Sequence, residues 1–288
     1  MYPPRFDYVA PTSLEEALDA LAEHGDEGKI IAGGQSLIPM LKLRFASPET
    51  LIDINRLPGM DGVSEEGGTL RFGALCRHNQ LGAHPLMTSK YHVVAEAGTL
   101  IADPLVRNMG SLGGSLCHAD PQADWGSVMI ALKATIVCQK KGATREFGAA
   151  EFMEGIFTTK LADDEIVTEI RCDAANGGFG SSYLKMERKV GDFATCGTAI
   201  ALTLKDGTIA SAGVGLTAMG AKNLHAEDAE KVLVGQAPSA ELFAEAAEAA
   251  VAIADVREDS RGTPEYKKNV LRTFMKRGLA KAALRAQA

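Results

Sequence analysis

The sequence predicts an α+β protein in two parts, and three patterns lead to this prediction. One amphipathic helix and two short apolar strands open the chain as a β/α unit. In the second half, an Asp-Gly pair between two alternating apolar runs predicts a β-hairpin. Between these regions the pattern breaks at 174–178, Ala-Ala-Asn-Gly-Gly, which is typical of a boundary. We therefore expect a first part at 1–176 and a smaller second part at 177–288.

The first unit has a clear helix start. Ser13-Leu14-Glu15-Glu16 matches a capping box, in which the side chain of Glu16 returns to the backbone of Ser13. Apolar residues then recur at helical spacing until Gly25, a stop signal. The strand expected at 29–32 runs directly into a glycine turn, and 51–54 is a second strand. Ligand loops of α/β folds tend to lie at such strand ends.

The later elements follow from the same periodicities. In the first part, strands are expected at 69–75, 134–139 and 165–171, and helices at 91–100 and 125–132. In the second part, strands are expected at 182–187, 198–204 and 208–216, with the turn at 205–207, and helices at 226–234, 240–254 and 264–286. This is an antiparallel hairpin sheet backed by helices. The last helix is basic around an apolar face. We expect it to pack on its own domain, with subunit docking as the second alternative.

Two glycine-rich loops carry the chemistry. They are Ile31-Ala32-Gly33-Gly34-Gln35-Ser36 and Met109-Gly110-Ser111-Leu112-Gly113-Gly114-Ser115. Glycine lets backbone N–H groups approach a ligand closely, and successive N–H groups form anion sites. The first loop is neither G-x-G-x-x-G nor a P-loop with its lysine, so a Rossmann or Walker site is poorly supported. One glycine pair alone is more often a tight turn. Two loops of matching chemistry favour a ligand with two phosphates, or one long enough to touch both.

Composition excludes several classes of function. The chain has 288 residues, a hydrophobic fraction of 46%, a charged fraction of 23% and a net charge of −7. No block of lysine and arginine is present, so nucleic acid is not an expected partner. No apolar run is long enough to span a bilayer, and no apolar h-region of a secretory signal is visible at the start. Five cysteines are scattered without a C-x-x-C pair, so we expect buried thiols in a reducing compartment rather than disulfides or an iron–sulfur cluster on this chain.

Two polar segments leave alternatives open. Cys117-His118-Ala119-Asp120, with Asp124, offers too few converging ligands for zinc or iron, so a metal site is not expected. Asp124 lies near a helix start, where its carboxylate could cap the helix or accept a hydrogen bond from a ligand hydroxyl. The charged segment 185–189 is either a solvated surface or a contact for an anionic cofactor. No nucleophile elbow or catalytic histidine pairing is present.

Several motifs together resemble a known family. They are the first loop with its continuation to Lys42, the segments 101–104, 107–115 and 118–121, the run from Lys185 to Ala194, and the closing helix at 261–272. In this order they resemble the medium, FAD-binding subunits of the xanthine dehydrogenase and carbon monoxide dehydrogenase family. The resemblance covers essentially the whole chain. It implies a two-part FAD-binding fold of the vanillyl-alcohol oxidase (PCMH) type, divided near residue 56, followed by a small α/β domain with an antiparallel sheet.

The resemblance also implies a cofactor and its site. The pyrophosphate of a non-covalent FAD would lie between the two loops, and Asp124 would sit near the ribityl or adenosine hydroxyls. Ile101, Leu161 and Lys185 match positions that contact the flavin or its adenine half in relatives. Phe193 stands where many relatives have a tyrosine beside the isoalloxazine, and it cannot donate a hydrogen bond. Neither loop contains a histidine that would suggest a covalent link.

The role implied is electron transfer within a larger assembly. A small partner subunit would carry two [2Fe–2S] clusters, and a large one would carry a molybdenum–pterin centre that oxidises the substrate. The flavin would pass electrons to NAD, a quinone or dioxygen. We expect a dimer of heterotrimers in the cytoplasm, or at the inner face of the membrane through its partners. A stand-alone FAD-dependent oxidase or reductase is the alternative, and a docking protein that has lost its flavin is a third hypothesis.

Overall fold

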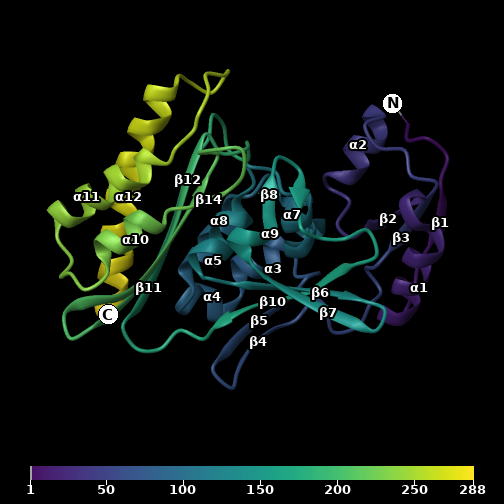
Figure 1. The fold of residues 1–288 in the computed structure, drawn as a ribbon, viewed down its shortest axis with the longest axis horizontal. Helices are drawn as coiled ribbons and strands as arrows, with labels where there is room; N and C mark the ends of the chain where they lie inside the picture. The colour runs from purple at the N-terminus through teal and green to yellow at the C-terminus, as the bar shows by residue number, and fades with distance from the viewer. Residues whose placement is uncertain (1) are drawn as a thin grey trace.

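A computed structural model describes residues 2–288, and the chain forms three adjoining lobes (Figure 1). The N-terminal lobe is a parallel sheet of three strands in the order β1-β3-β2. Its elements are β1 (Asp7–Val9), α1 (Leu14–His24), the short 3-10 helix η1 (Gly25–Glu27), β2 (Gly28–Ile31), α2 (Leu37–Leu43) and β3 (Thr50–Asp53). The predicted capping box is confirmed, because Glu16 N donates to Ser13 Oγ and Ser13 N donates to Glu16 Oε2.

The middle lobe is an antiparallel sheet of five strands in the order β4-β5-β10-β6-β7. The strands are β4 (Val63–Glu66), β5 (Thr69–Gly73), β6 (Thr135–Lys140), β7 (Ala143–Gly148) and β10 (Ile166–Asp173), and a small hairpin pairs β8 (Met153–Gly155) with β9 (Thr158–Thr159). Its helices are α3 (His78–Ala83), α4 (Pro85–Ser89), α5 (His92–Leu100), α6 (Pro104–Met109), α7 (Leu112–His118), α8 (Asp124–Ala131) and α9 (Ala149–Phe152). The predicted second loop is therefore a corner between two helices, with Leu112 to Ser115 in the first turn of α7.

The C-terminal lobe is an antiparallel sheet whose neighbouring strands follow one another in sequence. Its strands are β11 (Phe179–Met186), β12 (Cys196–Lys205), β13 (Thr208–Thr217) and β14 (Leu224–His225). Helices α10 (Glu227–Leu233), α11 (Ala240–Ala252) and α12 (Pro264–Gln287) cover one face, and helices of the middle lobe approach the other (Figure 1). The predicted Asp-Gly turn is confirmed, since Asp206 and Gly207 have φ of 51° and 78° between β12 and β13.

Two apolar clusters form the core. One fills the middle lobe around Trp125 and Phe72, and it includes Tyr183 from β11 of the C-terminal lobe. The other lies between the four-stranded sheet and α12, where Leu271 and Leu279 are fully buried. The basic helix therefore packs on its own lobe as expected. None of the helices described between residues 2 and 288 combines the length and apolar character needed to cross a bilayer.

Candidate functional site

The two glycine loops, from separate lobes, touch each other. A methyl group placed on Gly33 would lie 2.3 Å from the carbonyl oxygen of Met109 and 2.7 Å from Gly110 Cα. No side chain fits between the two backbones at this point. The structure thus places the first loop, between β2 and α2, against the corner between α6 and α7 at which the second loop begins.

The first loop presents unused backbone donors. Gly34 has a φ of +70°, a conformation that glycine adopts without strain. The side chain of Gln35 donates to Gly33 O at 2.9 Å and steadies the turn. The N–H groups of Gly33, Gly34, Gln35 and Ser36 donate no hydrogen bond to any of residues 2–288. Consecutive free N–H groups around a positive-φ residue form a concave site for an anion.

The second loop is held by the fold instead. Leu112 N donates to Cys76 O at 2.9 Å and Gly113 N donates to Ala74 O at 2.8 Å. Ser111 caps α7, accepting from Gly114 N. Ser111, Leu112 and Gly113 are buried, while Ser115 is half-buried and Gly114 is exposed. Free backbone N–H groups therefore come mainly from the first loop, and the second loop lies beside them with most of its own N–H groups already bonded.

Asp124 and Lys185 meet in the interior. Lys185 Nζ donates to Asp124 Oδ2 at 3.1 Å and to Leu100 O at 3.1 Å, and Tyr183 OH donates to Asp124 Oδ1 at 2.5 Å. Only 1% of the lysine side chain and 5% of the aspartate side chain are exposed. Burial raises the pKa of Asp124, and the lysine opposes that shift. Ala123, not Asp124, is the N-cap of α8, so the capping alternative for Asp124 is wrong. For Lys185, the solvated-surface alternative is also wrong.

The loop that carries Phe193 packs against Ala102, the residue after Ile101. A methyl group on Gly191, whose φ is +81°, would lie 2.6 Å from Ala102 O. Asp192 fixes this loop through Arg188 at 3.0 Å and Arg261 at 3.1 Å, and these partners lower its pKa to about 2, with the bond from Arg188 as the largest cause. Phe193 itself is 50% exposed. An aromatic face is thus available next to the segment that follows α5.

Leu161 lies apart from these contacts. It follows β9, which packs on α7, and it is half-buried against the core of the middle lobe. Its N–H donates to Thr159 Oγ1 at 3.3 Å.

Sequence reasoning missed three polar residues at the loops. Asn55 Nδ2 donates to Ala32 O at 2.8 Å, and Arg77 donates to both Asn55 Oδ1 and Met109 O. His78 N donates to Gly110 O at 3.2 Å, and its ring accepts from Trp125 Nε1 at 2.9 Å. Burial lowers the pKa of His78 to about 4, so the ring is neutral. The available signal was a polar residue just beyond each of two predicted strands, 51–54 and 69–75.

Thiols and metal ligands add nothing to the site. Within residues 2–288, no three His, Cys, Asp or Glu side chains are arranged to hold a metal ion. All five cysteines are free, and four of them are buried.

Comparisons with known proteins cover the whole chain. The family model described as the FAD binding domain in molybdopterin dehydrogenase matches residues 4–172, and the CO dehydrogenase flavoprotein C-terminal domain matches residues 181–282. The carbon monoxide dehydrogenase medium chain of Hydrogenophaga pseudoflava is 40% identical over 279 residues, 97% of each chain. The 6-hydroxypseudooxynicotine dehydrogenase complex subunit alpha of Paenarthrobacter nicotinovorans is 36% identical over 288 residues, 100% of this chain and 97% of the relative.

Solved structures agree closely with the fold. The carbon monoxide dehydrogenase of Hydrogenophaga pseudoflava that lacks the Mo-pyranopterin moiety of its cofactor superimposes with a TM-score of 0.95 at 42% identity, covering 99% of each chain. The quinoline 2-oxidoreductase of Pseudomonas putida 86 superimposes with a TM-score of 0.92 at 30% identity, covering 100% of each chain.

Proposed function

The chain belongs to the family of FAD-binding medium subunits of molybdopterin dehydrogenases, which are oxidoreductase subunits, and from this premise we propose that it relays electrons in such a complex. Its FAD would accept electrons from [2Fe–2S] clusters on a partner subunit and deliver them to an external acceptor. One observation carries the proposal. The first glycine loop offers free N–H groups where Gly33 lies against Met109 and Gly110 of the second loop.

The residues present fit the pyrophosphate of FAD. A dianionic group needs several N–H donors and close backbone approach, and the turn around Gly34 supplies both. We propose that Gly33, Gly34, Gln35 and Ser36 hold the pyrophosphate, and that Ser115 adds a hydroxyl from the second loop. When bound, FAD supplies the exchange between one-electron and two-electron partners, while the protein supplies orientation and electrostatics.

Further proposed contacts come from the remaining predicted residues. Phe193 would cover the flavin ring from the exposed loop beside Ile101, and Leu161 would contact another part of the cofactor. The buried pair of Asp124 and Lys185 would support this contact, because Lys185 donates to the carbonyl of Leu100 and so fixes the backbone just before Ile101. No covalent link to the flavin is proposed.

The partners would be a small [2Fe–2S] subunit and a large molybdenum subunit, in two copies of each chain. Relatives that align along the full chain are named for carbon monoxide, 6-hydroxypseudooxynicotine and quinoline. Such different substrates with one flavoprotein fold support substrate choice on the molybdenum subunit. We also propose a cytoplasmic location, supported by free thiols, with a domain boundary near residue 176 and a subdivision near residue 56.

Purification of the full chain, with any chains that copurify, tests the proposal. The expected protein is yellow, releases all its flavin on denaturation, and accepts electrons from a dye. Flavin that stays on the denatured polypeptide would contradict non-covalent binding. Oxidation of an organic substrate by the chain alone would favour the stand-alone oxidase. A colourless protein that binds no added FAD would refute the cofactor assignment.

A further inference from the structure

Two side chains join the glycine loops into one unit. Asn55 Nδ2 donates to Ala32 O at 2.8 Å, and its Oδ1 accepts from Arg77 Nη2 at 2.6 Å. The second guanidinium nitrogen, Arg77 Nη1, donates to Met109 O at 2.5 Å. We call Asn55 and Arg77 the clamp. It links a carbonyl of the first loop to a carbonyl of the second through three consecutive hydrogen bonds.

The clamp is anchored on the N-terminal lobe. Asp53, the last residue of β3, accepts from Asn55 N at 2.9 Å and from Asn55 Nδ2 at 2.6 Å. The other carboxylate oxygen of Asp53 accepts from Tyr8 OH on β1. The amide of Asn55 is therefore fixed in one orientation relative to the three-stranded sheet, with its oxygen turned toward Arg77.

The clamp is also anchored on the middle lobe. Arg77 is the N-cap of α3, and its N–H donates to Gln80 Oε1 at 3.2 Å. An isolated β-bridge pairs Arg77 with Ser111 of the second loop. A guanidinium is planar and presents its donors in a fixed fork, so its two terminal nitrogens bond to Asn55 and Met109 in one geometry, whereas the flexible ammonium of lysine has no such fork.

Pinning the carbonyl of Ala32 has a direct effect on the donors. The peptide bonds of residues 2–288 are trans, so the C=O of one residue and the N–H of the next point in opposite directions. Asn55 holds the Ala32 carbonyl, and this directs the N–H of Gly33 away from the clamp. That N–H is one of the free donors of the first loop.

We infer that Asn55 and Arg77 are positioning residues for the cofactor: they set the spacing of the two glycine loops and aim the donors of the first loop at the pyrophosphate. This inference rests on the proposed function, because it names what prepares the same site. Neither side chain needs to touch the cofactor. Without the clamp, the loops would meet the ligand in many orientations, and binding would have to restrict them.

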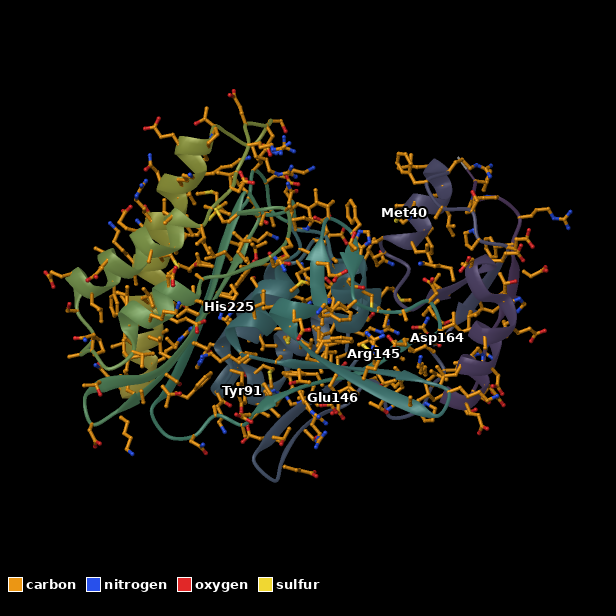
Figure 2. All side chains as sticks on the ribbon, viewed as in Figure 1. Met40, Tyr91, Arg145, Glu146, Asp164 and His225 are labelled. Carbon is orange, nitrogen blue, oxygen red and sulfur yellow. The ribbon has the colours of Figure 1, made fainter. Side chains whose placement is uncertain are left out.

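Titration of the flavin-free full chain with FAD, with any copurifying chains present, tests the inference. Asn55→Ala and Arg77→Met should each bind FAD about tenfold more weakly, which corresponds to ~1.4 kcal/mol. Arg77→Lys is the milder variant if either of these fails to fold, and it should weaken binding in the same direction. Arg171→Met is the matched control, because its guanidinium bonds to Glu146 on β7 of the five-stranded sheet (Figure 2), and this partly exposed pair touches neither loop.

Two further readouts separate positioning from general stability. Hydrogen exchange of the flavin-free variants should accelerate at 32–37 and 109–115 while remaining unchanged at 166–173 in β10. In the double variant, FAD affinity should be close to that of each single variant, since the two residues form one chain of bonds.

The outcomes are distinct. Wild-type protein that binds no FAD refutes the proposed function. Wild-type protein that binds FAD, with both clamp variants within twofold of it, overturns the inference alone. Additive losses in the double variant, or unchanged exchange at the loops, also overturn it.

Discussion

Protonation of His78 should destabilise the folded protein in mild acid. The ring is 5% exposed, and its Nδ1 accepts from the indole N–H of Trp125. A proton on Nδ1 would remove that acceptor and leave a buried donor without a partner. Burial, aided by the positive charges of Arg77 and Arg107, lowers the pKa of His78 from 6.5 to about 4. The folded protein therefore resists a proton that the unfolded chain accepts.

The sign and size of the effect follow from linkage. Between the two pKa values the unfolded chain binds more protons, so the free energy of unfolding falls as pH falls from 6.5 through about 4. Above the unfolded pKa the contribution is fully present. Each tenfold change in proton affinity is worth about 1.4 kcal/mol, so about 2 kcal/mol is lost between about pH 7.5 and about pH 5.

Urea unfolding of the wild type and of His78→Gln at about pH 7.5 and about pH 5 measures the contribution of His78 to the free energy of unfolding. Glutamine keeps an acceptor for Trp125 and cannot titrate. The variant should therefore lose about 2 kcal/mol less than the wild type over the same pH change. An equal loss of stability in both proteins would refute the assignment of acid sensitivity to this ring.

Three other predictions use the same contacts. Gly33→Ala should weaken FAD binding and lower the free energy of unfolding by about 1–3 kcal/mol, because its methyl group would overlap Met109 O. Gly177→Ala is the control, since a methyl group there meets nothing within 4 Å. It should leave both FAD affinity and stability unchanged. Lys185→Met should lower the free energy of unfolding by about 3–5 kcal/mol, because it leaves Asp124 buried without its cation, and adding Asp124→Asn should recover part of the loss in urea titrations. Burial raises the pKa of each of the five thiols to about 12, so a thiol reagent at neutral pH should label them only after denaturation. Rapid labelling of several thiols in the native protein would contradict this.

Elements with a local cause could be predicted from the sequence. The capping box at Ser13 and Glu16 depends on residues one turn apart, and the Asp206-Gly207 turn on two residues with positive φ. The long helix from Pro264 follows from spacing alone. Short helices such as α3 and α6 were missed, because one or two turns give too few repeats for a period to be recognised.

Contacts that join distant segments could not be predicted this way. Arg77 bonds to Asn55 and Met109, which are 22 and 32 positions away, and Lys185 bonds to Asp124 across 61 positions. The local sequence around each of these residues does not indicate which distant residue it will contact. The charged segment at 185–189 does not share one environment: the side chain of Lys185 is buried on Asp124, Glu187 is half-buried, and Arg188 and Lys189 are exposed.

The second glycine loop takes its shape from the chain that follows β5. Residues 74–78 bond to it through three backbone contacts, which are Gly113 N to Ala74 O, Leu112 N to Cys76 O and His78 N to Gly110 O, at 2.8, 2.9 and 3.2 Å. Ala74 N in turn donates to Thr168 O of β10, so this loop is attached to the five-stranded sheet. The first loop follows β2 and is attached to the three-stranded sheet. A ligand that touches both loops therefore depends on how the two lobes are joined. The clamp of Asn55 and Arg77 connects these two lobes. Its loss should therefore weaken FAD binding while leaving the packing of both apolar clusters nearly unchanged.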